Sequence, residues 1–281
     1  MGHWKLDDIK WDQFNADAVD LRLLELVKAA SLVEANSGDY VTYLNRVFNN
    51  DARVKAAFEQ WGVEEIQHGQ ALGRWAEMAD PSFSFERALS DFRQNYSLPL
   101  DADESVRGSR TGELVSRCVI ESGTSSFYTA IKDGTDEPVL KQIAGHIAAD
   151  EFRHYALFLT KLQTFEADER VTLMDRVKVA IGRLRETEDD ELAMAYYCAN
   201  HIGAGIAYDR EANWAAYEGR ALDYYQQRHI LRATSMMVKA MGLHPHGWFA
   251  NFMGKVTWAG FRAKRWQHQR AAGQEQQAIA A

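Results

Sequence analysis

The sequence predicts an all-α protein, a four-helix bundle extended by further C-terminal helices. Of the 281 residues, 46% are hydrophobic, which is enough to bury one large core. Only four prolines are present, and none lies beyond the first turn of four segments in which apolar residues recur with a helical period. Those four segments also carry a duplicated Glu/His pattern, which predicts four neighbouring helices.

The first helix follows an N-terminal arm. Residues 1–17 show no sustained period and are expected to lie along the bundle, whereas helical periodicity begins near Ala18. The apolar stripe of this helix places Glu34 among small or apolar neighbours. These neighbours are Val27, Ala30, Gly38 and Val41.

The next three helices each carry Glu or His on an apolar stripe. The second, about 52–79, presents Glu65 and His68, and is followed by a connecting segment that holds a short helix near 85–96. The third helix, about 111–132, presents Glu121. The fourth, about 137–165, presents Glu151 and His154.

The chain therefore divides into four parts. The arm (1–17) precedes the bundle (18–167), which is followed by additional helices packed on it (168–270) and a frayed tail (271–281). In the third part, helical patterns occur at about 170–186, 189–201, 208–239 and 248–270.

The most informative motif is a duplicated Glu-x-x-His step. Glu65 lies 31 residues after Glu34 and is followed by His68, while Glu151 lies 30 residues after Glu121 and is followed by His154. About 30 residues bring a chain from the middle of one helix to the middle of its antiparallel neighbour. Residues three apart share a helix face, so the six side chains are predicted to converge inside the bundle.

Such a ligand set predicts a site for two metal ions. Four carboxylates would balance two divalent cations, whereas four buried glutamates without cations would be costly to bury. Oxygen-rich ligation with one imidazole per ion favours iron, or alternatively manganese, over zinc. The opposing interpretation is that these glutamates face solvent and the histidines are ordinary core residues.

Two further acids lie next to the proposed ligands. Glu64 precedes Glu65, and Asp150 precedes Glu151, in the same relation. Each could accept the free ring N–H of the histidine from the other half, as carboxylates behind metal ligands do. Alternatively, both lie on solvated helix flanks.

Charge and cysteine content exclude several classes of protein. The formal net charge of −8 argues against nucleic-acid binding. Cys118 and Cys198 form no CxxC pair, and neither a signal peptide nor a membrane span is recognised, so a cytoplasmic protein is expected.

The segments around Glu34, Glu64-Glu65-Ile66-Gln67-His68-Gly69, Glu121-Ser122-Gly123-Thr124 and Asp150-Glu151-Phe152-Arg153-His154 resemble the soluble acyl-carrier-protein desaturases of the ferritin-like superfamily. The resemblance covers about residues 20–165. It implies a diiron site that activates O2 with electrons from ferredoxin and oxidises an unactivated acyl chain. It also implies that Thr124 lies beside the O2 position, whereas a threonine bonded to its own helix carbonyl is the alternative.

Several alternatives stay open. The spacing between the lone glutamates and the Glu-x-x-His steps is closer to that of aldehyde-deformylating and other small diiron oxygenases, so hydroxylation and deformylation are alternatives to desaturation. An iron-oxidising or peroxide-detoxifying protein is the alternative function. The expected partners are an acyl carrier protein, a ferredoxin-type donor and a second copy in a homodimer.

The sequence also bears on the substrate space and on the last helix. Small residues near the ligands, Ala30, Gly38 and Ser125, predict a tunnel for an acyl chain, unless Phe58, Tyr128 and Phe158 close it. The last helix interleaves aromatic and basic residues from Trp248 to Arg270. It is expected to pack on the bundle or a second subunit, or to bind an acidic partner or a membrane surface.

Overall fold

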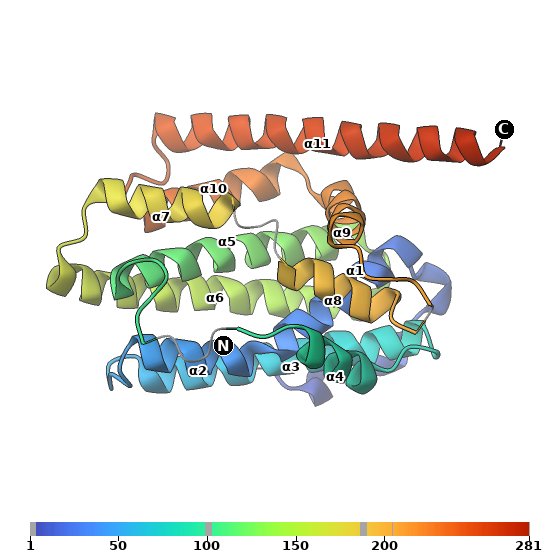
Figure 1. Cartoon of the computed structure of the whole chain (residues 1–281), viewed down its shortest axis with the longest axis horizontal. Helices are drawn as coiled ribbons and strands as arrows, with labels where there is room; N and C mark the ends of the chain where they lie inside the picture. The colour runs from blue at the N-terminus through green and yellow to red at the C-terminus, as the bar shows by residue number, and fades with distance from the viewer. Residues whose placement is uncertain (1–3, 99–102, 186–189, 204, 281) are drawn as a thin grey trace.

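The computed structural model describes residues 4–98, 103–185, 190–203 and 205–280, and the side chains of residues 185 and 272–280 are not described. Every regular element in these residues is a helix, which confirms the predicted all-α class (Figure 1). No helix in this part of the chain is both long and apolar enough to cross a membrane.

Four helices supply the predicted Glu and His residues: α1 (Leu21–Ala35), α3 (Lys55–Ala79), α5 (Arg110–Gly134) and α6 (Pro138–Glu169). The contact of α5 with α6 and that of α1 with α3 are the two most extensive, and α3 also contacts α6. Side chains cap the starts of α1, α5 and α6, for example Ser109, whose hydroxyl accepts from Gly112 N–H, whereas α3 begins without such a cap.

Glycine allows α1 and α3 to approach closely. A Cβ added at Gly69 would lie 2.6 Å from Ala35 N and 2.7 Å from Ser31 O. Only a residue without a side chain fits at this distance. The approach brings Glu34 on α1 level with Glu65 and His68 on α3.

The predicted first helix breaks at Asn36. The backbone leaves helical geometry there (φ −88°, ψ 5°), and a separate helix, α2 (Ser37–Val47), follows. Gly38 is consequently exposed, so its predicted place on the inner stripe is wrong. The run Asn36-Ser37-Gly38-Asp39 consists of residues that favour caps and turns over helix interiors, which accounts for the break.

The remaining helices surround this framework. After α4 (Phe85–Asn95), these are α7 (Leu173–Arg185), α8 (Asp190–Asn200), α9 (Arg210–Tyr224), α10 (Gln227–Ala240) and α11 (Trp248–Ala280). Helix α8 packs on α1, α10 packs on α5, and α11 packs on α10 and α9 (Figure 1). The segment expected as a frayed tail falls largely within the bounds of α11, and its side chains lie outside the description.

The single helix predicted over 208–239 is two helices. The chain is extended at Tyr225 and Gln226, between α9 and α10. Arg265 of α11 donates hydrogen bonds to the carbonyl oxygens of Leu222 and Tyr225, so a tertiary contact satisfies the helix end. The local periodicity could not indicate this break.

The N-terminal arm consists of three short 3-10 turns, Leu6–Asp8, Trp11–Gln13 and Ala16–Ala18. It contacts α6 and α3. Lys10 N donates to Gln142 Oε1 at 3.0 Å, and Gln67 Nε2 donates to Trp4 O at 3.0 Å. Trp4 is buried at the end of this arm.

Two apolar clusters lie on either side of the predicted ligands. One contains the aromatic side chains Phe48, Phe58, Phe158 and Phe165, from the end of α2, the early part of α3 and the late part of α6. The other contains Trp75, Tyr128 and Ile143, from the late parts of α3 and α5 and the early part of α6. The Glu and His residues therefore occupy a polar layer between two dry parts of the core.

Candidate metal centre

The structure brings all six predicted residues together in two overlapping groups. Glu34, Glu65, His68 and Glu151 form one, and Glu65, Glu121, Glu151 and His154 form the other, with one ligand atom from each residue within 4.8 Å of the others. All six are buried, none more than 7% exposed. Glu65 and Glu151 belong to both groups.

In each histidine, Nδ1 faces the carboxylates. His68 Nδ1 lies 3.2 Å from Glu151 Oε1 and 3.5 Å from Glu34 Oε2. His154 Nδ1 lies 2.9 Å from Glu65 Oε1 and 3.8 Å from Glu121 Oε2. The two rings thus face the centre from α3 and α6, which agrees with the i, i+3 geometry of each Glu-x-x-His step.

The other nitrogen of each ring meets an acid from the opposite half of the repeat. His68 Nε2 lies 3.1 Å from Asp150 Oδ2, and His154 Nε2 lies 2.9 Å from Glu64 Oε2. Both acids are buried, so the predicted crossed contacts are confirmed and the solvated alternative is wrong. A carboxylate that accepts the Nε2 hydrogen keeps the proton on that nitrogen and leaves the Nδ1 lone pair for a cation.

Each of these acids is held in turn. Asp150 Oδ2 also accepts the Trp4 indole N–H at 2.7 Å, and Asp150 pairs with Arg153. Gln60 Nε2 donates to Glu64 Oε1 at 2.9 Å. The Trp4 ring also stacks parallel to His68, with 6.1 Å between the ring centroids. These contacts fix the orientation of both imidazoles.

When no cation balances the negative charge of the cluster, its electrostatics favour protonated carboxyl groups. Burial and the Glu151 and Glu34 carboxylates raise the pKa of Glu65 well above its ordinary value. Burial, followed by Glu151 and Glu65, does the same to the pKa of Glu121. At Glu151 burial is outweighed by the two histidines, which lower the pKa of this carboxyl.

Burial acts on the pKa of the histidines in the opposite direction, because it lowers their pKa. Burial disfavours the charged ring, but polar contacts with Asp150, Glu151 and Glu34 outweigh it and raise the pKa of His68 well above its ordinary value. For His154, the hydrogen bond with Glu64 and the charge of Glu151 outweigh burial and raise its pKa. Protons therefore hold the metal-free cluster together.

The pattern of unsatisfied atoms fits a cation better than a proton network. Buried atoms without a hydrogen-bond partner include Nδ1 of both histidines and one oxygen each of Glu34, Glu65 and Glu151. Buried polar atoms are rarely left unpaired, and here five of them converge on one place. Their types, carboxylate oxygen and imidazole nitrogen, are metal ligands. The cluster can therefore hold a metal ion.

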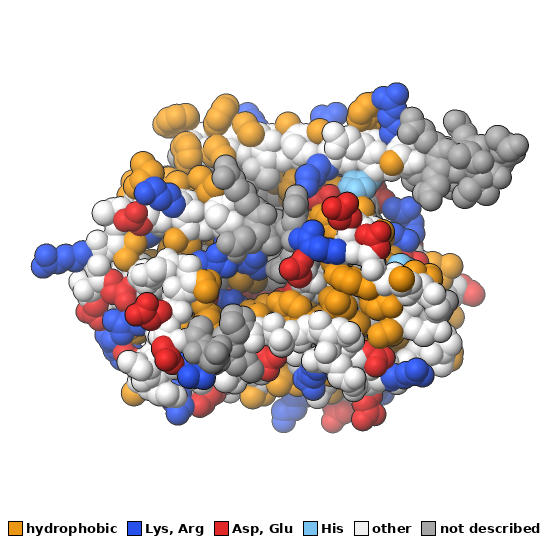
Figure 2. Space-filling view, in the orientation of Figure 1, with side chains coloured by type: hydrophobic (Ala, Val, Ile, Leu, Met, Phe, Trp, Pro, Cys, Tyr) orange, Lys and Arg blue, Asp and Glu red, His pale blue; other side chains and the backbone are white. Residues whose placement is uncertain are grey.

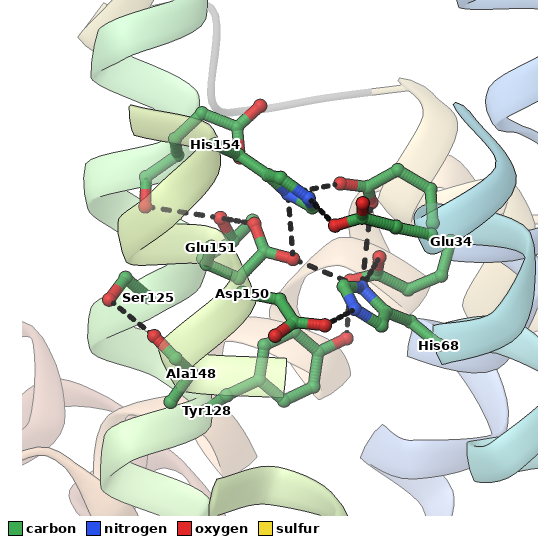
Figure 3. Close-up of polar contacts among 12 residues, drawn as sticks. Glu34, His68, Ser125, Tyr128, Ala148, Asp150, Glu151 and His154 are labelled. Atoms are coloured by element: carbon green, nitrogen blue, oxygen red, sulfur yellow. Dashed lines mark hydrogen bonds and ion pairs between the residues drawn. The ribbon is translucent and has the colours of Figure 1, made fainter. Parts of the chain in front are cut away.

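Two hydroxyl groups contact the cluster. Thr124 Oγ1 donates to Glu151 Oε2 at 2.6 Å, and also lies 3.3 Å from the carbonyl oxygens of Ile120 and Glu121. Tyr128 Oη donates to Glu34 Oε1 at 2.5 Å (Figure 3). The threonine thus combines a cluster contact with the back-bonding that the sequence left as its alternative.

Sequence reasoning missed three contributors to this site. Trp4 belongs to an arm without periodicity, and Tyr128 was considered only as a bulky side chain that could close the tunnel. Arg117 was not singled out, although it lies one turn before Glu121 and is 6% exposed. A buried arginine at i−4 from a predicted ligand was the available signal for the last of these.

Comparison with protein-family models finds no match, and comparison with curated proteins finds none either. Function is therefore inferred from the site itself.

Proposed function

We propose that this protein is a ferritin-like diiron oxidoreductase that uses O2 to oxidise an unactivated C–H bond. The observation that supports it most strongly is the pair of overlapping ligand groups, each with one imidazole nitrogen and with Glu65 and Glu151 in common. A single-ion site would need no shared carboxylates, whereas two ions held close together do.

The donor set supports iron. Each ion would receive one imidazole and oxygen atoms from carboxylates, with no thiolate among the described donors, and this set suits iron or manganese better than zinc. Glu34 and His68 would hold one ion, Glu121 and His154 the other, and Glu65 and Glu151 would contact both. Two irons bound here would supply the two-electron activation of O2.

The protein's own residues would hold and shield this chemistry. Asp150 and Glu64 keep the histidines in one tautomer, while Thr124 directs its hydroxyl hydrogen to Glu151 on the cavity side of the cluster. The apolar clusters on both sides exclude water from the helix interior. The proposed substrate is an acyl group, with a ferredoxin-type electron donor and a homodimeric assembly as further proposals from the resemblance.

Metal analysis tests the site. Protein produced with ample iron should contain about two iron ions per chain, and Glu65→Ala and Glu151→Ala should each lose most of both ions because each removes a shared ligand. Glu59→Ala, an exposed glutamate on the same helix, is the matched control and should retain the metal. Iron content well below two that is equal in all four proteins would exclude the diiron site.

Activity is tested separately. The reduced, iron-loaded protein should consume O2 in the presence of ferredoxin and an acyl substrate, with a product lighter by two mass units for desaturation or heavier by sixteen for hydroxylation. Rapid consumption of hydrogen peroxide with every acyl substrate unaltered would instead favour the iron-oxidising or peroxide-detoxifying alternative.

A further inference from the structure

A cavity of about 150 Å³ lies directly beside the candidate metal centre. One side of it is formed by the four cluster glutamates and Thr124. The other side is formed by residues of α2, α3, α5, α7 and α8, among them Tyr40, Trp61, Arg117, Arg183 and Glu191. Figure 2 shows this face of the molecule hollowed near its centre, where basic (blue) and hydrophobic (orange) side chains meet.

Arg117 is the cavity residue whose chemistry is not accounted for by the fold. Its side chain is buried, its Nε lies 3.4 Å from Glu113 Oε1, and its guanidinium lies 4.7 Å from the Tyr40 ring centroid. No other carboxylate of the described residues lies within ion-pair distance of it. Among the described residues, only its Nε donates a hydrogen bond, and the side chain lines the cavity.

Glu113 does not occupy all the hydrogen-bond donors of this arginine. Its Oε2 accepts hydrogen bonds from Tyr43 Oη at 3.0 Å and Ser105 Oγ at 2.7 Å. Only the Nε side of Arg117 is engaged by the other oxygen, Oε1. The guanidinium fork can therefore hold a second carboxylate through its terminal nitrogens, in the two-pronged geometry that arginine prefers.

The charge around the cavity also favours an anion. Beyond the metal centre, the described lining contains Arg117, Arg183 and Glu191, whose Oε2 accepts the Tyr40 hydroxyl hydrogen at 2.6 Å. The buried positive charge of Arg117 at this cavity attracts anions. Two divalent ions would neutralise the four cluster carboxylates that would otherwise repel them.

We propose that the cavity binds a short-chain carboxylic acid as the free anion, with its carboxylate on Arg117 and its carbon chain directed toward Thr124 and Glu151. This inference rests on the proposed function and names its substrate class. A cavity of about 150 Å³ is smaller than the roughly 300–1,000 Å³ of sites for drug-sized ligands, so only a small molecule fits. A thioester on a carrier protein has no carboxylate for Arg117 to hold.

The spacing of residues along α5 determines which carbon atoms of the bound acid lie near the metal centre. Arg117, Glu121 and Thr124 lie at i, i+4 and i+7 on one helix face, about 6 Å and about 10 Å apart along the axis. With C–C bonds of about 1.5 Å, an extended six-carbon chain spans about 6 Å, which is the axial separation of Arg117 and Glu121. Oxidation is therefore expected several carbons away from the carboxylate, and not at the carbon next to it.

The test compares an acid with its neutral isostere. Hexanoate and hexanamide are titrated by calorimetry into iron(II)-loaded protein under nitrogen, so that binding is measured without turnover. The native protein should bind hexanoate about tenfold or more tightly than hexanamide, since a charge-assisted hydrogen-bond pair contributes this much. Arg117→Gln should bring the two affinities within about twofold, and Arg117→Lys should keep part of the preference.

The ratio of the two affinities distinguishes loss of the Arg117 contact from misfolding, because a damaged cavity would weaken the binding of both ligands equally. Arg232→Gln, which removes an exposed arginine of α10 outside this cavity, should leave the preference unchanged. A preference for hexanoate that persists in Arg117→Gln would place the carboxylate on the metal ions and overturn the inference. So would equal affinities in the native protein.

The two proposals can fail separately. Binding of hexanoate through Arg117 without O2 consumption would refute the proposed function and support this site. O2-dependent oxidation of a carrier-bound acyl group by Arg117→Gln at the native rate would support the proposed function and refute the free-acid substrate.

Discussion

At the scale of single residues, the metal centre depends on the different partners of the two ring nitrogens in each histidine. His68 and His154 both give Nε2 to an acid from the opposite half of the repeat and leave Nδ1 to the cluster. This arrangement was predictable from sequence, because the acids Glu64 and Asp150 adjoin the ligands in the same register. The Trp4 contact to Asp150 was not, since it joins residues 146 apart.

Removing one of these acids should weaken metal binding without removing a ligand. Asp150→Asn places an amide against His68 Nε2, which lowers the basicity of the ring, and should reduce iron affinity about 10–100-fold. Competition with a chelator measures the affinity, with Glu59→Gln on the outer face of α3 as control. Affinity equal to that of the native protein would show that Asp150 does not orient the histidine.

Tyr128 is expected to stabilise the fold through Glu34. Tyr128→Phe removes the hydrogen bond to a buried carboxylate and should lower the free energy of unfolding by about 1–3 kcal/mol, as measured by urea denaturation. Tyr197→Phe loses a hydrogen bond to the Ile206 carbonyl at an exposed position and should change stability by less than about 0.5 kcal/mol. Equal losses in both variants would contradict this assignment.

At the scale of helices, local sequence signals predicted where the four ligand helices lie but not every break. Helix α3 ends at Asp80-Pro81 because proline cannot continue a helix. Helix α5 ends at Gly134 because glycine does not favour one. The break after α9 depends on Arg265, which lies 40 residues later than Tyr225. A contact of that range leaves no trace in local periodicity.

The close approach of α1 and α3 makes Gly69 intolerant of a side chain. Gly69→Ala would place its Cβ 2.7 Å from both Ala35 Cβ and Ser31 O, and should destabilise the protein by about 1–3 kcal/mol in urea denaturation. Gly123→Ala on α5 is the matched control, because no atom lies within 4 Å of its Cβ. It should stabilise by about 0.5–1 kcal/mol through helix propensity alone, and a loss comparable to that of Gly69→Ala would contradict the steric argument.

At the scale of the whole molecule, the duplicated spacing predicted that two halves meet and that their ligands converge. It could not predict the cavity, because Arg117, Tyr40 and Glu191 come from helices whose relative placement depends on tertiary packing. The small residues predicted to line a tunnel do not line this cavity. Ala30 and Ser125 are buried elsewhere, and Gly38 is exposed. On α11, Trp248 is 81% exposed and Phe252 56%, so part of its aromatic face is uncovered in the isolated chain.

Stability of the metal-free protein should fall as pH rises. Glu65, Glu121, His68 and His154 all have folded-state pKa values raised above their unfolded values. Their stabilising contribution is complete below the unfolded values, about 4.3 for Glu and 6.5 for His, and is lost as pH rises through the folded values. Melting temperatures of chelator-treated protein should therefore decrease from pH 6 to pH 9.

Metal loading should reverse that trend. Bound cations replace the protons, and metal affinity increases with pH as competing protons leave, so the loaded protein should gain stability over the chelated protein as pH rises. The difference between the two melting temperatures at each pH measures this linkage. A chelated protein that melts at higher temperature as pH rises would contradict the assigned pKa shifts.

The contact of Trp4 with Asp150 sets an order of events during biosynthesis. The arm is made before its partner on α6, which lies 146 residues later, so Trp4 cannot contact Asp150 until the last ligand helix exists. Closing so long a loop follows the local formation of helices. Until then the Trp4 ring does not cover His68, and a metal ion can reach its ligands before the arm seals that edge of the site.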